Sequence, residues 1–369
     1  MKTVHRIIFG DSREMKDLPD GSVDLMVTSP PYPMIEMWDS IFSKQNEAVS
    51  SALCAGEGDR AFELMHCELD KVWREVYRVL KDGGFACINI GDATRTIGGE
   101  FKLYANHARV LQCCLKLGFS SLPAILWRKQ TNAPNKFMGS GMLPAGAYVT
   151  LEHEYILVLR KGGKRRFRNE ADKLRRMRSA FFWEERNLWF SDVWEDLKGT
   201  RQNNIDKSIR ERSGAYPFEL AYRLINMFSL KEDVVLDPFL GTGTTMVASM
   251  AAGRNSVGVE IDPEFREHVF SRCMGVVGFA NQLIEARLLR HVSFVQERVK
   301  AKGALRYFNR FYGFPVMTSQ ETEIVFDELS KFSAMGDCVF EVEYKEKPTW
   351  FFKNDSMLSK ENLSLTDWT

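Results

Sequence analysis

Residues 236–245 read LDPFLGTGTT and decide the fold. The apolar residues before this stretch predict a buried strand, and those after it predict a helix. Gly241 and Gly243 allow the connecting turn to bend tightly and let a ligand approach the backbone. Glu260 ends the next predicted strand, 19 positions after Gly241, where a carboxylate can accept hydrogen bonds from the hydroxyls of a ribose. This part of the chain is therefore predicted to hold a nucleoside cofactor.

The same stretch departs from two other nucleotide-binding patterns. Met246 stands where the dinucleotide fingerprint GxGxxG has its third glycine, and no Gly-Lys-Ser/Thr follows, so a P-loop is not predicted either. An ordinary strand–turn–helix junction without a ligand is the alternative interpretation. A second motif elsewhere in the chain is needed to decide between the two.

The rest of the chain alternates short apolar runs with stretches of helical periodicity. Residues 62–80 have a clear helical pattern, and residues 81–84 (KDGG) are predicted to close that helix with a glycine cap. Such alternation predicts an α/β protein with a doubly wound, mostly parallel sheet. Further predicted strands cover 4–9, 23–28, 85–90, 122–128, 155–160, 233–237, 256–260 and 340–344, and further helices cover 105–117, 217–228 and 281–302.

A second motif, TSPPY at 28–32, follows a predicted strand, and ligand sites lie at the carboxyl ends of strands in open α/β sheets. Pro30 and Pro31 stop the strand and fix the direction of its last carbonyl groups. An exocyclic amine on a base is a poor nucleophile because its lone pair is delocalised into the ring. Hydrogen bonds to the Ser29 hydroxyl and the Pro30 carbonyl would free that lone pair, and Tyr32 offers a flat face to the base. A proline turn with a buried tyrosine is the alternative.

The composition carries no sign of a membrane or secreted protein. The 369 residues have a net charge of +1, and the chain contains neither a run of apolar residues long enough to cross a bilayer nor a signal peptide. The seven cysteines form no CxxC pair and the six histidines no HExxH motif, so we expect reduced thiols, no metal site and a cytoplasmic location. The small net charge still allows a local basic surface.

The two motifs in this order, TSPPY at 28–32 and DPFLGTGTT at 237–245, resemble the amino-methyltransferases of bacterial and archaeal restriction-modification systems. The order is similar to their β group, in which the catalytic motif comes first. The resemblance spans roughly residues 4–270 and implies a Rossmann-like, S-adenosylmethionine-dependent enzyme. It also implies that the two motif strands lie side by side and that the target base is flipped out of duplex DNA. Shorter supporting segments are Gly10-Asp11-Ser12, 80–84, 152–155 and 216–220.

The resemblance also implies roles for individual residues. Asp11 is expected near the adenine of S-adenosylmethionine, and Pro217 and Phe218 near its methionine end. The implied catalytic residues are Ser29, Pro30, Pro31 and Tyr32. The other implied cofactor contacts are Asp237, Phe239, Gly241, Gly243, Thr244 and Glu260.

Serine at the first position of the catalytic motif resembles the family members that methylate cytosine N4, whereas aspartate is usual in those that methylate adenine N6. We therefore expect Ser29 to act on cytosine N4, with adenine N6 as the alternative. Methylation of cytosine C5 is not expected, because it needs a Cys nucleophile after Pro and the chain has no Pro-Cys dipeptide. A catalytically silent DNA-binding module with the same fold is a further alternative, from another class of protein.

Residues 161–178 carry nine lysines and arginines against Glu170 and Asp172. This run lies where the family places its target-recognition region, and we expect it to contact phosphates and base edges of double-stranded DNA. A solvated basic loop is the alternative. The expected DNA contacts are Lys164, Arg165, Arg166, Arg168, Arg175 and Arg176.

The motifs divide the chain into four expected regions. These are a catalytic half over 1–160, a target-recognition region over 161–212, a cofactor half over 213–275 and a C-terminal extension over 276–369. The resemblance leaves the extension unexplained, and target recognition, a dimer contact and packing on the sheet stay open as its role. We expect a monomer or homodimer, with a restriction endonuclease as a genetic rather than a physical partner.

Overall fold

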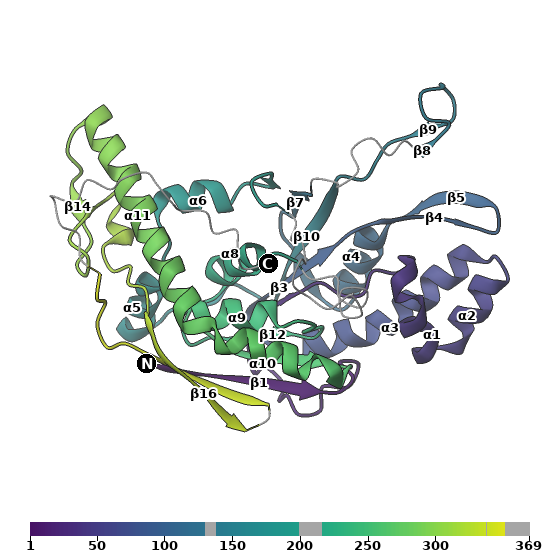
Figure 1. Ribbon diagram of the computed structural model, residues 1–369, viewed down its shortest axis with the longest axis horizontal. Helices are drawn as coiled ribbons and strands as arrows, with labels where there is room; N and C mark the ends of the chain where they lie inside the picture. The colour runs from purple at the N-terminus through teal and green to yellow at the C-terminus, as the bar shows by residue number, and fades with distance from the viewer. Residues whose placement is uncertain (130–137, 199–215, 337, 351–369) are drawn as a thin grey trace.

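The computed structural model describes residues 1–129, 138–198, 216–336 and 338–350, so parts of the expected target-recognition region (199–212) and of the extension (351–369) lie outside the described residues. The main sheet has the order β11-β7-β10-β3-β2-β12-β13-β1-β17-β16, and β6 also pairs with β10 (Figure 1). Its strands are β1 (Lys2–Phe9), β2 (Val23–Thr28), β3 (Leu80–Ile90), β6 (Phe119–Ser121), β7 (Ile125–Arg128), β10 (His153–Lys161), β11 (Val193–Trp194), β12 (Val234–Asp237), β13 (Asn255–Glu260), β16 (Leu329–Gly336) and β17 (Val339–Tyr344).

The five central strands, β3, β2, β12, β13 and β1, run parallel to one another. β10 and β17 flank them on the two sides and are antiparallel to their neighbours. The expected mostly parallel sheet is therefore confirmed. The two motif strands are also neighbours, since Leu25 and Met26 of β2 pair with Val235 and Leu236 of β12.

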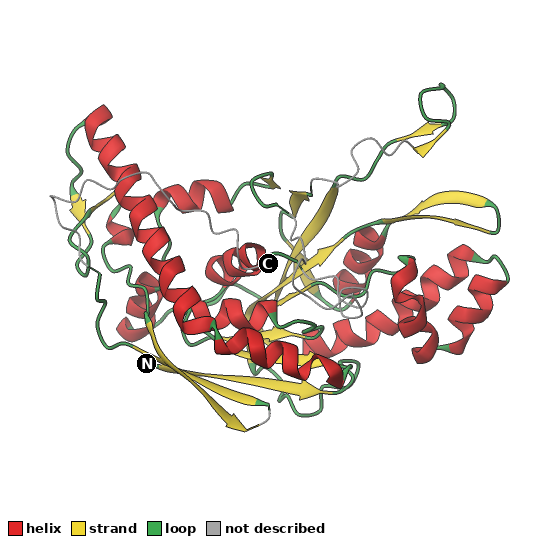
Figure 2. Cartoon of the chain, in the orientation of Figure 1, coloured by secondary structure: helices red, strands yellow, loops and turns green. Residues whose placement is uncertain are grey.

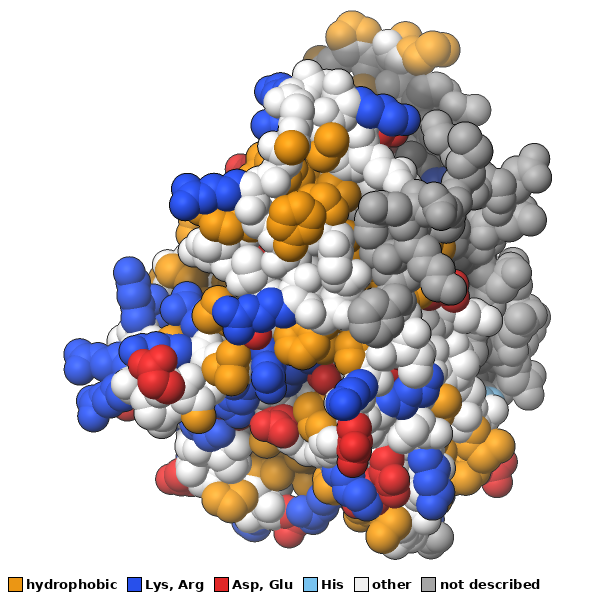
Figure 3. All heavy atoms as spheres, turned by 90° about the vertical axis from the view of Figure 1, so that its left-hand side faces the viewer, with side chains coloured by type: hydrophobic (Ala, Val, Ile, Leu, Met, Phe, Trp, Pro, Cys, Tyr) orange, Lys and Arg blue, Asp and Glu red, His pale blue; other side chains and the backbone are white. Residues whose placement is uncertain are grey.

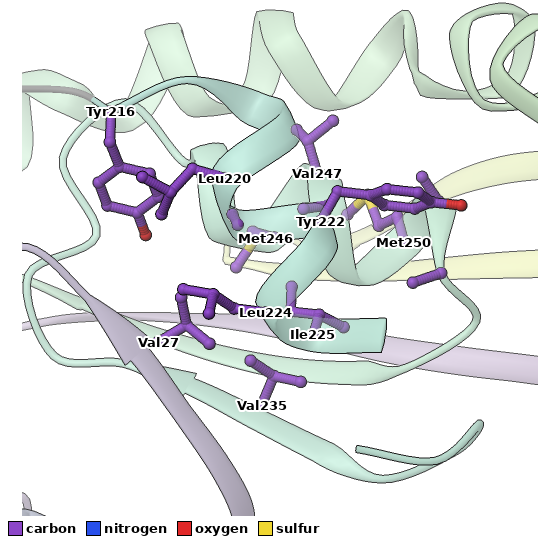
Figure 4. Close-up of a cluster of buried hydrophobic side chains, with 14 of the residues drawn as sticks. Val27, Tyr216, Leu220, Tyr222, Leu224, Ile225, Val235, Met246, Val247 and Met250 are labelled. Atoms are coloured by element: carbon purple, nitrogen blue, oxygen red, sulfur yellow. The ribbon is translucent and has the colours of Figure 1, made fainter. Parts of the chain in front are cut away.

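Helices cover both faces of this sheet, as a doubly wound fold requires (Figure 2). Leu25, Val27 and Val235 point to one face and Met26 and Leu236 to the other, because successive side chains of a strand alternate. The first face packs against α8 (Phe218–Phe228), α9 (Thr244–Ala251), α10 (Arg266–Met274) and α11 (Val276–Lys302), and Figure 4 shows the α8–α9 contact. The second face packs against α1 (Asp39–Gln45), α2 (Glu47–Cys54), α3 (Gly58–Val79) and α4 (Asn106–Lys116).

The parallel strands give the sheet two chemically distinct edges. We call the edge where β1, β2, β3, β12 and β13 end the carboxyl edge, and the opposite edge the amino edge. In Figure 1, β1 runs from left to right, so the carboxyl edge faces the right-hand side. Two hairpins project on that side, β4 (Ala93–Ile97) with β5 (Glu100–Tyr104), and β8 (Met138–Gly139) with β9 (Ala147–Tyr148).

The connection from α3 to β3 differs from the expected glycine cap. Leu80 ends the helix in an extended conformation and already pairs with Val23 of β2, so the strand begins at once. The register then jumps to Leu25 opposite Phe85, and residues 81–84 form an irregularity within the strand. Gly83 adopts a φ of +83° there, and a side chain at this position would meet the backbone of Arg165 at 2.9 Å. The predicted helix is confirmed, but its predicted cap is wrong.

The C-terminal part of the chain completes the sheet. β17 pairs antiparallel with β1, from Lys2 opposite Glu343 to Arg6 opposite Val339, and β16 pairs with β17. The expected helix over 281–302 is α11, which begins at Val276 and packs along the α8–α9 layer. A third buried cluster joins α11 to Phe182 and to the segment 312–326. Within the described residues, no helix combines the length and the apolar character needed to span a bilayer.

Candidate active site

Four loops meet at the carboxyl edge in the order set by the sheet. β2 leads to Ser29, β12 to the glycine turn at Gly241, β13 ends at Glu260 and β1 leads to Asp11. Neighbouring strands lie roughly 4.8 Å apart, so these loops form a continuous row. Direct bonds join them: Thr28 Oγ1 donates to Asp237 Oδ1 over 2.6 Å, and the Gly10 N–H donates to the Glu260 carbonyl over 2.9 Å.

The catalytic loop is anchored from the side by a buried asparagine at the start of α4. Asn106 Nδ2 donates to the carbonyls of Pro33 and Gly91, each over 3.0 Å, and its Oδ1 lies 3.0 Å from His66 Nε2. Met34, just after the loop, is buried with a φ of +68°, a backbone conformation that costs a non-glycine residue free energy. The loop after β2 is therefore held in a defined shape by the surrounding packing.

A hydrogen-bonded cluster surrounds the side chains of the catalytic motif. The Tyr32 hydroxyl lies 3.0 Å from Ser29 Oγ and donates to Glu154 Oε2 over 2.9 Å. Asn89 Nδ2, at the end of β3, donates to both the Tyr32 hydroxyl (2.9 Å) and Glu154 Oε2 (2.7 Å). Lys129 Nζ donates to the other oxygen, Glu154 Oε1, over 2.9 Å. β10 brings Glu154 here because it is antiparallel, so that Tyr155 lies opposite Ile90.

The protonation of this cluster follows from its burial. Burial of the Tyr32 hydroxyl, together with the charge of Glu154, raises its pKa well above the usual value, so it keeps its proton. A carboxylate only accepts hydrogen bonds, so the single Tyr32 proton points to Glu154. The contact with Ser29 must then be donated by the serine, which leaves both lone pairs of Ser29 Oγ free to accept.

The glycine turn leaves open space at one position and is tightly packed at another. Gly241 has a φ of +51°, and a Cβ added there would meet only the Phe239 carbonyl, at 4.0 Å. Gly243 has a φ of +81°, but a Cβ added there would meet Val269 at 2.9 Å. Gly241 therefore faces room for a ligand, whereas packing on α10 explains Gly243.

The two acidic side chains of the cofactor half are held by neutral donors. Glu260 accepts from the Gly241 N–H (2.7 Å) and the Asp262 N–H (2.9 Å), and burial raises its pKa. Asp237 accepts from Thr28, from the Phe239 N–H (3.0 Å) and from Thr245 Oγ1 (2.5 Å), and burial raises its pKa too. The glycine turn is thus tied to the carboxylates on either side of it.

Asp11, unlike Asp237 and Glu260, has a cationic neighbour. Arg13 Nε donates to both of its oxygens, over 3.0 and 2.8 Å, and the Arg13 N–H donates to Oδ1 over 2.9 Å. Burial opposes ionisation of Asp11, but the hydrogen bonds and charge of Arg13 outweigh it, and the pKa lies below its usual value. Asp11 therefore stays a charged acceptor, and one third of its side chain is exposed.

Comparisons with known proteins agree with this arrangement. The N6/N4 methyltransferase model, described as a DNA methylase, matches residues 23–271. The chain belongs to this DNA methylase family. It is 50% identical to the type II methyltransferase M.MthZI of Methanothermobacter thermautotrophicus over 94% of this chain and 96% of that protein. It is also 50% identical to the type II methyltransferase M.MjaI of Methanocaldococcus jannaschii, over 72% and 89% of the two chains.

A solved relative connects the methylase to its cofactor. TTHA0409 of Thermus thermophilus was crystallised with S-adenosyl-L-methionine; it is 34% identical, with a TM-score of 0.57, over 73% of this chain and 92% of that one. S-adenosylmethionine is the cofactor of this family. The residues present fit a nucleoside cofactor, because open space beside Gly241 lies in one row with two acidic acceptors, Glu260 and Asp11.

The other expected cofactor residues form hydrogen bonds or pack against neighbours within the methylase itself. Asp237 is 3% exposed and also receives a bond from the Tyr216 hydroxyl (3.3 Å), so its oxygens already hold the turn. Its implied direct contact with the cofactor stays a prediction that this bonding disfavours. The Thr244 hydroxyl is buried and receives a bond from Arg272 over 3.1 Å, which turns it toward α10. Pro217 and Phe218 begin α8 next to Tyr216, and Phe239 packs on Trp73 with ring centroids 6.1 Å apart.

The basic run lies at the opposite edge from the catalytic motif. Arg165 makes a two-pronged ion pair with the buried Asp233 (2.6 and 2.9 Å) and approaches Asp24 at 3.7 Å, and Arg175 approaches Asp233 at 3.5 Å. Asp24 lies at the start of β2, and Asp233 immediately precedes β12. Both cations neutralise carboxylates of the fold, so the expectation that Arg165 and Arg175 contact the target DNA stays a prediction that this pairing disfavours.

The four other expected DNA contacts share this location but are exposed. Lys164, Arg166 and Arg168 precede α5 (Glu170–Arg178), and Arg176 lies on it. β2 is six residues long, so the two edges are roughly 20 Å apart at a rise of about 3.3 Å per residue. Duplex DNA placed on the catalytic loop would have to extend roughly 20 Å along the protein to reach them. Their contact with the target duplex stays a prediction that this position disfavours.

Sequence reasoning assigned no role to several residues that shape the site. Glu154 was part of a supporting segment, but its approach to Tyr32 depends on the antiparallel pairing of β10 with β3. Asn89 ends a predicted strand, and only the strand order shows that it faces the cluster. Tyr216 was likewise within a supporting segment, and its bond to Asp237 spans 21 positions. Polar residues at the ends of predicted strands were the available signal.

Proposed function

We propose that this DNA methylase methylates the exocyclic N4 of cytosine in duplex DNA. The observation that carries the proposal is the Ser29 hydroxyl, which Tyr32 and Glu154 leave as an acceptor at the carboxyl edge beside the glycine turn. Serine at this position is also the feature by which the motif resembles cytosine-N4 enzymes. Adenine N6, which presents the same pair of N–H groups, is the alternative target.

The chain acts on the target by aligning its amine. Ser29 Oγ accepts one N–H of the amine and the Pro30 carbonyl accepts the other, which favours a more tetrahedral nitrogen and frees its lone pair. When bound, S-adenosylmethionine would supply an electrophilic methyl group at this edge, and the amine would release one of its protons to solvent on methylation. The neighbouring strands β2 and β12 hold the amine and the cofactor turn in fixed relation, which lowers the entropic part of the barrier.

Tyr32 provides a rigid surface for a base that has left the duplex. Its ring edge lies against Gly91, where an added Cβ would meet Tyr32 Cε2 at 2.9 Å, and its hydroxyl has three hydrogen-bond partners. A fixed aromatic face favours stacking of an extruded base. Because Ser29 is only partly exposed, a base within an intact duplex would not present its amine there, and we infer base flipping.

The relatives designated type II methyltransferases support a protective role in a restriction-modification system. We propose a restriction endonuclease of the same target sequence as the genetic partner. In cells that carry both genes, loss of activity in a Ser29→Ala methylase would leave the target sites open to cleavage. Survival of such cells with an active endonuclease would contradict this partner.

Nucleoside mass spectrometry tests the choice of base. Duplex DNA of mixed sequence is incubated with the protein and methyl-labelled S-adenosylmethionine, then digested to nucleosides. Labelled N4-methylcytosine is the expected product, and it should be absent with Ser29→Ala. Labelled N6-methyladenine would keep the mechanism but overturn the base. Absence of label on any nucleoside would favour a silent DNA-binding module.

A further inference from the structure

The amino edge carries a large hollow that the methylation site does not use. It has a volume of about 920 Å³ and lies between the basic run (161–178), α6 (Trp183–Trp189) and the end of α8. Figure 3 views this side of the molecule, where lysine and arginine side chains gather around hydrophobic ones. We call this feature the amino-edge groove; its cationic lining residues are Lys81, Arg160, Lys164, Arg165, Arg176 and Arg186.

Four of these cations have no carboxylate within ion-pair distance in the described part of the chain: Arg160, Lys164, Arg176 and Arg186. The lining also contains three acidic residues, Asp24, Asp82 and Glu321, and the first and last of these already have hydrogen-bond or ion-pair partners. Asp24 pairs with Lys81 at 2.8 Å and lies near Arg165, and Glu321 accepts from the Trp183 N–H (2.8 Å) and from Thr318. The groove therefore presents an excess of positive charge, although the whole chain is nearly neutral.

Aromatic side chains form the other part of the lining. Phe85, Phe228, Phe190 and Phe181 form a chain of ring contacts, with successive centroids 4.9, 6.3 and 5.3 Å apart. Trp183 and Phe190 are 40% and 41% exposed, so part of each ring faces solvent. Arg186 lies over the Phe190 ring at 5.8 Å, and Arg176 over Phe167 at 4.7 Å.

We propose that the amino-edge groove binds single-stranded nucleic acid. Cations that have no carboxylate partner among the described residues, beside partly exposed rings, suit a flexible strand, whose phosphates meet the cations while its splayed bases stack on the aromatic faces. A duplex keeps its bases stacked internally and would meet only the cations at the rim. The site is separate from the methylation site, because the central strands place it roughly 20 Å from Ser29. The proposal goes beyond the choice of target base and does not depend on it.

Fluorescence anisotropy tests this groove in the full-length protein. The probe is a labelled oligothymidylate of about 20 nucleotides, which is longer than the stretch that one single-strand-binding domain covers. Arg160→Gln with Arg186→Gln, two lining cations outside the set expected to contact the target duplex, should lower the affinity and reduce the slope of log Kd against log salt by roughly 1.4, about 0.7 for each lost phosphate contact. Trp183→Ala should weaken binding about 5- to 100-fold. Arg166→Gln is the matched control, since Arg166 is exposed in the same segment but does not line the groove.

The expected pattern is weaker oligonucleotide binding in the groove variants, unchanged oligonucleotide binding in Arg166→Gln, and unchanged kcat of the groove variants on duplex DNA. Three results would overturn the proposal: no binding of the oligonucleotide at low salt, equal binding of a duplex of the same length with no effect of Trp183→Ala, or loss of methylation in the groove variants. Each of these leaves the nucleoside assay of Ser29 unaffected, so the two proposals fail separately.

Discussion

The amino edge and the glycine turn of the carboxyl edge hold their carboxylates in different ways, although two other carboxylates at the carboxyl edge, Asp11 and Glu154, do have cationic neighbours. At the amino edge, Asp24 and Asp233 pair with arginine and lysine side chains. At the carboxyl edge, Asp237 and Glu260 accept from backbone N–H groups and hydroxyls, and within the described residues no lysine or arginine forms an ion pair with either. The ion pairs at the amino edge hold the starts of β2 and β12 to the basic run. The neutral donors at the carboxyl edge instead fix the glycine turn and keep its acceptors beside open space.

The comparison shows that the position of charge on the fold, rather than its density in the sequence, indicates function. The most basic segment of the chain contributes ion pairs to the amino edge, while the catalytic loop carries no cation of its own. A parallel sheet produces this asymmetry, because all of its carboxyl ends converge on one edge. Substitutions at the carboxyl edge should therefore lower activity, and substitutions at the amino edge should lower stability.

The largest expected effect is at the carboxyl edge. Ser29→Ala should lower kcat at least about 100-fold, because it removes an acceptor that is needed only as the amine becomes nucleophilic. Binding of S-adenosylmethionine, measured by titration calorimetry, should be unchanged. The matched control is Ser22→Ala, since Ser22 lies at the other end of β2 and donates to the Pro19 carbonyl. Equal activity of both variants would remove Ser29 from the mechanism.

The effects on kcat of substituting Glu154 and Tyr32 should be strongly coupled. Glu154→Gln and Tyr32→Phe should each lower kcat roughly 10- to 100-fold, because either change frees Ser29 to point its proton elsewhere. If Glu154 acts through Tyr32, the double variant should be no worse than either single variant in a double-mutant cycle. Additive losses would mean that Glu154 acts on the substrate directly. Glu152→Gln is the control, since Glu152 lies on the same segment, its side chain is 45% exposed and it contacts Arg128 rather than the Tyr32 cluster.

Much of the carboxyl edge could be predicted from sequence because its determinants are local. The glycine turn needs left-handed backbone at Gly241, and the prolines after Ser29 end a strand, and both features are visible in a few consecutive residues. Parallel pairing of β2 with β12 followed from the resemblance and is confirmed. The alternation of apolar residues predicted the sheet and most of its helices.

The unpredicted features depend on contacts between distant residues. Glu154 and Tyr32 are 122 positions apart, and Arg165 and Asp233 are 68 positions apart. A run of arginines is equally compatible with binding phosphate and with neutralising buried aspartates, and only the strand order distinguishes the two. The glycine cap after α3 failed for a related reason, because pairing of Leu80 with Val23 overrode the local turn signal.

Substitution of Glu260 in the cofactor loop should change the affinity for S-adenosylmethionine rather than the rate of methylation. Glu260→Gln should raise the Kd for S-adenosylmethionine about 10- to 100-fold, because the amide loses a charged acceptor and places a donor against Gly241 or Asp262. At saturating cofactor, kcat should change less than about 3-fold. Glu267→Gln on α10, which is exposed, is the control. An unchanged Kd, measured by calorimetry, would exclude the ribose role of Glu260.

The smallest effect on catalysis is expected at the amino edge. Arg165→Ala should lower the free energy of unfolding by about 1–3 kcal/mol, because Asp233, only 2% exposed, loses its two-pronged partner and keeps Arg175 at 3.5 Å. The expected loss is below that for a fully buried pair, since the Arg165 side chain is 30% exposed and partly screened by water. Urea unfolding measures the loss.

The same Arg165→Ala protein should methylate duplex DNA with an unchanged KM, because its cation is engaged in the fold and lies at the edge opposite Ser29. Arg166→Ala removes an equal charge from the adjacent exposed position and should leave the unfolding free energy within about 0.5 kcal/mol. A higher KM for Arg165→Ala without any loss of stability would reverse the assignment. It would mean that the duplex reaches the amino edge, and the contrast between the two edges would then lie within one extended DNA-binding surface.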